Sequence, residues 1–214
     1  MTVSRQKPVV ALSMRITEAP HYPERRDAIS HDWIKLLEAW GVIPAPVPNV
    51  LADAASYLDR LQPDILILTG GDDIGTTPER DVAETAMLDH ALETGLPVFG
   101  VCRGLEIINT HLGGSLIDLE GHAGKPHEVS VSPPWVELYG ETPEVNSFHA
   151  LGIAEDGMAA ELTVAARDDE NRVEAFYHRD KPLAAVMWHP ERGEALEGDR
   201  LLIMGLVEQG AFWN

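Results

Sequence analysis

The chain has 214 residues, enough for one domain with a sizeable core. Acidic residues outnumber basic residues 35 to 16, and the resulting net charge of −19 excludes nucleic acid and anionic membranes as expected partners. A single cysteine excludes an internal disulfide, and no Cys or His spacing fits a metal site, so we expect no cofactor. Because we find neither a leader segment nor a membrane-spanning run, we expect a cytoplasmic protein.

The first half of the chain alternates short apolar runs with segments of helical period. The predicted strands are 8–14, 42–48, 64–71 and 97–102, and the predicted helices are 28–41, 51–61 and 79–95. Fully apolar strands between amphipathic helices indicate a mostly parallel sheet that is covered on both faces. The prolines of 42–48 place that strand at the outer edge of the sheet.

The pattern changes after about residue 120, where short β-rich runs follow one another with few helices between them. These runs are 127–133, 135–140, 161–166, 172–178 and 183–189. We predict antiparallel additions to the sheet, with 183–189 returning to its core and a closing helix at 198–212. The fold class is therefore α/β, with a single domain over residues 1–214.

Cys102 lies where an apolar strand changes into a helix, and ligands of open α/β sheets gather at such strand ends. A helix that begins at this position directs free N–H groups and its positive dipole end toward the sulfur. This placement predicts a lowered pKa for Cys102 and a role as nucleophile. Gly100 and Gly104 flank the cysteine, as in the sharp turn of a nucleophile elbow. The alternative is a buried structural thiol.

A nucleophile needs a base that is held in place by an acceptor. His189 ends an apolar strand, and Glu191 follows closely enough for its carboxylate to reach the imidazole. Gly70 and Gly71 end another predicted strand, and their backbone can donate an N–H to an oxyanion beside that of Arg103. Taken singly, the histidine also fits a rim residue, and the glycines also fit an ordinary turn.

Four segments together, LTGGDDI, GVCRGLEIIN…LGGSL, VNSFHALGI and VMWHPE, resemble class I glutamine amidotransferases in order and spacing. The resemblance is greatest to the γ-glutamyl hydrolase branch, of the peptidase C26 type, and it covers nearly the whole chain. It implies a flavodoxin-like α/β/α fold, a catalytic triad and an oxyanion hole formed by the backbone of Gly71 and Arg103. The implied triad is Cys102, His189 and Glu191. It also implies attack on the γ-carbonyl of a glutamyl amide, giving a thioester that water hydrolyses.

By the same resemblance, Asn146, Ser147 and His149 line the glutamyl pocket, while a plain loop is the alternative for these three residues. The chain departs from the family pattern immediately after them, since Ala150 and Leu151 replace a second His and a Gln. This departure leaves the expected chemistry intact and concerns the binding of the substrate.

Glu106 is a second departure, because the family commonly has Gln four residues after the cysteine. On a helix that opens at Cys102, residue 106 lies one turn on and on the same face, so it is predicted to face the pocket. An ionised Glu106 can accept a hydrogen bond from the substrate's α-ammonium group but cannot donate one. The alternative is that Glu106 turns aside and pairs with a surface Lys or Arg.

The function expected from these observations is hydrolysis of a small γ-glutamyl conjugate. Residues 14–33 resemble a subgroup that acts on a nucleotide-linked amidate, with Arg15, Arg25 and Arg26 as candidate phosphate contacts. A solvated basic turn is the alternative for these arginines. The alternative functions are a glutaminase subunit that supplies ammonia to a partner synthase, and a non-catalytic regulator on the same fold. A homodimer is compatible with each.

Overall fold

The centre of the molecule is an eight-stranded sheet with the strand order β4-β1-β5-β6-β14-β13-β12-β9. The computed structural model describes residues 7–119 and 124–213. The first five strands in this order run parallel: β4 (Ile43–Val47), β1 (Val9–Ser13), β5 (Ile65–Leu68), β6 (Val98–Val101) and β14 (Leu183–Val186). The last three are antiparallel to their neighbours: β13 (Val173–His178), β12 (Leu162–Arg167) and β9 (Ser130–Val131).

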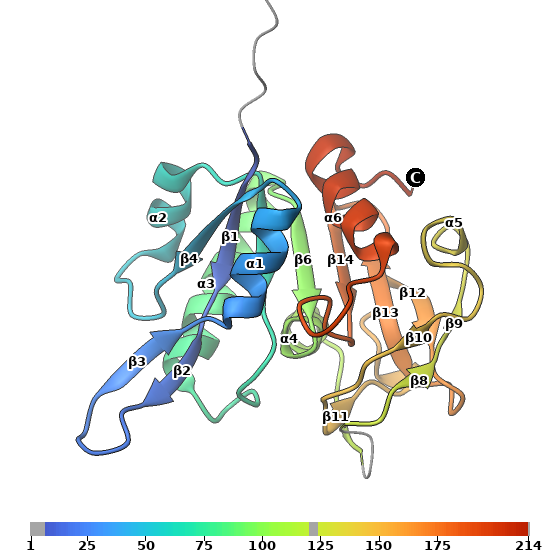
Figure 1. Ribbon diagram of the computed structural model, residues 1–214, viewed down its shortest axis with the longest axis horizontal. Helices are drawn as coiled ribbons and strands as arrows, with labels where there is room; N and C mark the ends of the chain where they lie inside the picture. Colours follow the sequence, from blue (N-terminus) through green and yellow to red (C-terminus); the bar gives the residue numbers. More distant parts are fainter. Residues whose placement is uncertain (1–6, 120–123, 214) are drawn as a thin grey trace, which may run out of the picture.

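Helices cover both faces of the sheet, which gives the predicted three-layer α/β/α arrangement (Figure 1). One face carries α1 (His31–Ala39) and α6 (Glu197–Gln209), and the other carries α2 (Ala54–Leu61), α3 (Pro78–Thr94) and α4 (Arg103–His111). The strands β5 and β6 are buried along their whole length. Strands covered on both faces read as continuous apolar runs, which is why the sequence predicted them.

The smaller elements lie outside this sheet. A two-stranded hairpin of β2 (Arg15–Glu18) and β3 (Arg25–Ala28) projects from the body of the molecule (Figure 1). Two short antiparallel pairs join β7 (Ile117–Asp118) to β11 (Leu151–Gly152) and β8 (His127–Glu128) to β10 (Glu144–Val145). A four-residue helix, α5 (Val136–Tyr139), and a 3₁₀ turn at Glu155–Gly157 complete the described elements.

Two predictions of secondary structure need correction. Residues 135–140 were predicted as a strand, but Val136–Tyr139 form α5, and the backbone N–H of Tyr139 donates to the carbonyl of Trp135 at 3.1 Å. The two rings stack with centroids 5.9 Å apart, because side chains four residues apart share one face of a helix. The helix predicted over 28–41 begins later, at His31, where the Ser30 hydroxyl accepts from the Asp32 N–H.

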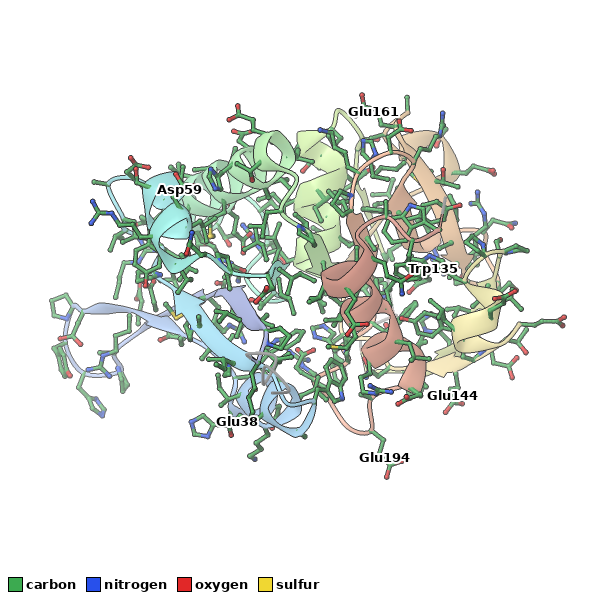
Figure 2. The ribbon with its side chains drawn as sticks, turned by 90° about the horizontal axis from the view of Figure 1, so that it is seen from above. Glu38, Asp59, Trp135, Glu144, Glu161 and Glu194 are labelled. Carbon is green, nitrogen blue, oxygen red and sulfur yellow. The ribbon has the colours of Figure 1, made fainter. Side chains whose placement is uncertain are left out.

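The large negative charge lies mainly on the surface. Figure 2 shows exposed carboxylates on separate elements that point away from the body, whereas Trp135 lies inside. The labelled carboxylates are Glu38, Asp59, Glu144, Glu161 and Glu194. None of the described helices is both long enough and apolar enough to cross a membrane.

Candidate active site

Cys102 occupies a sharp turn between β6 and α4. Its backbone has φ +50° and ψ −107°, a left-handed conformation that is rare for a residue with a side chain. The two flanking glycines allow close packing at this turn. A Cβ on Gly104 would lie 2.0 Å from the carbonyl oxygen of Leu68, and one on Gly100 would lie 2.7 Å from Ile108 Cδ1. The turn therefore has the strained geometry of a nucleophile elbow.

His189 and Glu191 lie beside this cysteine. The two side chains are buried, and His189 Nδ1 is 2.8 Å from Glu191 Oε1. A Cβ added to Gly70 would lie 2.6 Å from His189 Cε1 and 3.4 Å from Cys102 Cβ, so the imidazole and the cysteine approach the same point. Among the residues that the structure describes, none forms a hydrogen bond with His189 Nε2. That nitrogen is thus available to receive a proton.

Asn146 holds the main chain of His189. Its Oδ1 accepts from the His189 N–H at 2.9 Å, and its Nδ2 donates to the carbonyls of His189 and Arg192, each at 2.9 Å. The ring of Phe148 meets the imidazole edge-on, with the centroids 5.6 Å apart. Asn146 therefore contacts the main chain that carries the base, and does not line the cavity described next.

A cavity of about 230 Å³ opens over Cys102. His149 and Glu106, two of the residues predicted to face the substrate, contribute to its wall, whereas Ser147 is buried and does not line it. The wall is formed from several elements and carries both signs of charge. Its members are Arg15, Gly71, Asp72, Asp73, Cys102, Arg103, Glu106, Phe148, His149, Ala150, His189 and Arg192.

Glu106 lies in the wall of the cavity and is only 3% exposed. Its pKa is raised to about 7, first by burial and then by the nearby carboxylate of Asp73, while Arg103 and Arg80 act in the opposite direction. The structure thus places Glu106 in the pocket rather than in a pair with a surface Lys or Arg. Near neutral pH this carboxyl group is therefore partly protonated.

The pKa of Cys102 differs from the sequence prediction. It is raised to about 12, first by burial and then by the neighbouring Glu106, although the hydrogen bond from the Arg103 backbone N–H acts in the opposite direction. The predicted lowering is therefore wrong, because burial outweighs the helix N-terminus. With this pKa the resting side chain is a thiol at neutral pH.

Gly71 and Arg103 provide the two backbone N–H groups predicted to bind an oxyanion. Gly71 has φ +86°, and a Cβ there would lie 2.6 Å from Arg15 Nη2, so both the conformation and the close contact require glycine. Within the described part of the chain, the Gly71 N–H has no hydrogen-bond acceptor. The side chain of Arg103 pairs with Asp81 and Glu84, so only its backbone is directed toward Cys102.

The three candidate phosphate-binding arginines occupy different surroundings. Arg15 lines the cavity, with its guanidinium 3.6 Å from Asp72. Arg25 pairs with Glu79, and Arg26 pairs with Glu24 and Tyr22, and neither lines the cavity.

Sequence reasoning missed Arg192, whose guanidinium lies 4.4 Å from the centroid of the Phe148 ring at the cavity wall. The signal was its position next to the His-x-Glu motif. It also missed Asp73, although the residue follows Gly70 and Gly71 in a segment that was singled out.

Within 7–119 and 124–213, no cluster of three or more His, Cys, Asp or Glu side chains is arranged to hold a metal ion.

Residues 8–191 match the family model of peptidase C26. The chain belongs to the peptidase C26 family. This C26 protein is 28% identical over 202 residues to the γ-glutamyl-CDP-amidate hydrolase of Campylobacter jejuni, which covers 90% of this chain and 94% of the relative. It is 31% identical over 190 residues to the γ-glutamyl-γ-aminobutyrate hydrolase of Escherichia coli O157:H7, with 71% and 73% covered. The C26 protein is thus a hydrolase with γ-glutamyl hydrolases among its relatives.

Proteins named for other functions also resemble this C26 protein. The anthranilate synthase of Azospirillum brasilense is 40% identical over 159 residues, which cover 72% of this chain but only 21% of the relative. The chain therefore spans about a fifth of that protein's length. A solved glutaminase domain of CTPS from Trypanosoma brucei, with bound acivicin, superposes with a TM-score of 0.71 at 15% identity and covers 97% of each chain. That likeness shows the shared fold, the flavodoxin-like fold of class I glutamine amidotransferases.

Proposed function

We propose that this protein hydrolyses the γ-glutamyl amide bond of a small conjugate through a thioester on Cys102, releasing glutamate. One observation carries the proposal. The cysteine at the strained turn lies beside the buried imidazole of His189, and Nδ1 of that imidazole is bound to Glu191. Two relatives are named as hydrolases of γ-glutamyl compounds, which supports the γ-glutamyl amide bond as the bond that is cleaved. Cys102, His189 and Glu191 are the proposed catalytic residues.

In the first step, the sulfur of Cys102 attacks the γ-carbonyl carbon, and its proton passes to His189 Nε2. The carbonyl oxygen becomes an oxyanion, for which the N–H groups of Gly71 and Arg103 are the proposed donors. The imidazolium, stabilised by Glu191, then gives its proton to the leaving nitrogen. The C–N bond breaks, the amine departs, and a γ-glutamyl thioester remains.

In the second step, water attacks the thioester carbonyl while His189 Nε2 takes one of the water protons. The C–S bond breaks, the proton returns to the sulfur of Cys102, and glutamate is released. This order of events fits a cysteine that is a thiol at rest. The sulfur loses its proton only as it attacks the carbonyl, and it regains a proton when the C–S bond breaks.

The charges of the cavity wall support a finer proposal about the substrate. Asp73 and Glu106 offer acceptors for the α-ammonium of the glutamyl group. Arg15 and Arg192, whose side chains are 44% and 37% exposed, offer positive charge on the same cavity. We assign these arginines to a leaving amine that carries an anionic group, a carboxylate or a phosphate.

The proposal is tested by measuring glutamate release from a panel of γ-glutamyl amides and by labelling with a glutamine-like diazoketone. The wild type should add one label per chain, and Cys102→Ser should add none and release no glutamate. His111→Asn is the control, because this histidine ends the same helix, α4, and pairs with Asp89 at the surface. It should label and turn over like the wild type.

Three results would separate the alternatives. Labelling or turnover that persists in Cys102→Ser would exclude the thioester mechanism. Glutamate release that occurs only with glutamine, and only after a partner synthase is added, would establish the glutaminase subunit instead. An intact Cys102 that takes no label and releases no glutamate from any amide would indicate a non-catalytic regulator.

A further inference from the structure

Arg80, a buried arginine that the proposed steps do not use, lies behind the loop that carries Gly71. It belongs to the first turn of α3, and its side chain is completely buried. Its guanidinium donates to the carbonyl oxygens of three consecutive residues: Thr69 at 2.6 Å, Gly70 at 3.2 Å and Gly71 at 2.5 Å. The loop between β5 and α3 is therefore bound through its main chain by one side chain.

Carboxylates fix the orientation of this guanidinium. Nε donates to Glu84 one turn later at 2.9 Å, and Nη1 is 3.2 Å from Asp72. Glu84 also pairs with Arg103, the residue that follows the nucleophile. One fully buried carboxylate thus connects the arginine behind the loop with the arginine at the start of α4.

The bonds from Arg80 determine where the Gly71 N–H points. In a trans peptide, the carbonyl of one residue and the N–H of the next point in opposite directions. Because the carbonyl of Gly70 faces Arg80, the N–H of Gly71 faces away from Arg80, and Gly71 lines the cavity beside Cys102.

The loop needs such support, because its conformation is unusual. Gly71 has φ +86° and Asp72 has φ +57°, so two successive residues lie in the left-handed region. Asp72 has a Cβ, and this conformation is sparsely populated for such residues unless surrounding contacts maintain it.

We propose that Arg80 is a positioning residue of the oxyanion hole: it holds the Gly70–Gly71 peptide so that the Gly71 N–H meets the developing oxyanion. This inference rests on the proposed function. Arg80 acts through the main chain and touches neither the substrate nor the sulfur in the proposed steps. It should affect the rate of the chemical steps much more than the binding of the ground state.

The test compares Arg80→Lys with the wild type in two reactions of Cys102. Lysine keeps the charge but cannot bind three carbonyls with a planar fork of donors. Loss of one oxyanion donor lowers kcat by roughly 100- to 1000-fold, so a misdirected donor should lower kcat by at least about 30-fold and leave KM within about threefold. Alkylation by iodoacetamide forms no oxyanion, and its rate should stay within about threefold of the wild-type rate.

Arg172→Lys is the matched control, because Arg172 also forms a largely buried ion pair, with Asp168 at 2.6 Å, in the turn between β12 and β13. It should leave both reactions unchanged. If Arg80→Lys does not fold by circular dichroism, Arg80→Gln replaces it with the same expected results.

Wild-type kcat in the Arg80 variant would overturn the inference, as would an alkylation rate that falls in parallel with kcat. The proposed function fails separately, through a Cys102→Ser variant that keeps its activity.

Discussion

Among single residues, Glu106 combines an unusual identity with an unusual environment. It lies beside the proposed nucleophile, and burial raises its pKa from an ordinary value of 4.5 to about 7. The folded protein thus binds a proton that the unfolded chain releases between these pH values. By linkage, folding stability due to this group falls as pH rises from about 4.5 to about 7.

Glu106→Gln should remove this pH dependence, since glutamine does not ionise. Relative to the wild type, the free energy of unfolding of the variant should increase between pH 5 and pH 8, by up to about 3 kcal/mol. Urea titrations at the two pH values measure the difference. Glu144→Gln changes an exposed carboxylate and should stay within about 0.5 kcal/mol at both. A constant difference for Glu106→Gln would contradict the raised pKa.

At the scale of elements, the β2–β3 hairpin brings a distant part of the chain to the site. Arg15 opens β2, and its guanidinium lies against Gly71 in the cavity wall. Arg25 starts the returning strand of the same hairpin and pairs with Glu79 instead. The two arginines therefore form a natural pair of test and control positions.

Arg15→Met should weaken the use of conjugates whose leaving amine is anionic. The value of kcat/KM for such a conjugate should fall by about tenfold or more, equivalent to roughly 1.4 kcal/mol for one charged contact. A conjugate with a neutral leaving amine should change by less than about twofold. Arg25→Met should behave like the wild type with both substrates. Equal losses for both conjugates in Arg15→Met would exclude the charge assignment.

Local patterns predicted much of the fold and little of the electrostatics. The strands at 64–71 and 97–102 and the neighbourhood of His189 and Glu191 were predictable because each depends on a few adjacent residues. The helix at 135–140 was missed, since its stability depends on aromatic side chains that stack in the folded chain. The pKa of Cys102 was mispredicted, because burial is a property of the tertiary structure. The contact of Arg80 with the loop between β5 and α3 could not be predicted either, because it depends on how α3 packs in the folded protein.

At the scale of the whole molecule, apolar packing joins the sheet to the helices on both of its faces. The apolar side chains of the sheet and of the helices on both faces form one continuous buried cluster. The chain has a single cysteine, and the part described in the structure holds no group of side chains suited to a metal.

Treatment with a chelator and a reductant together should therefore leave the melting temperature unchanged. Differential scanning calorimetry with and without both reagents measures this directly. A large decrease would reveal a bound metal ion or an intermolecular disulfide.

The high pKa of Cys102 also has a consequence for oxidative damage. Peroxides react with thiolates, and a pKa of about 12 leaves only about one part in 10⁵ of the resting side chain as thiolate at pH 7. The chain has no second cysteine that could trap a sulfenic acid as an internal disulfide. The burial that raises the pKa of this thiol should therefore also slow its oxidation by peroxides.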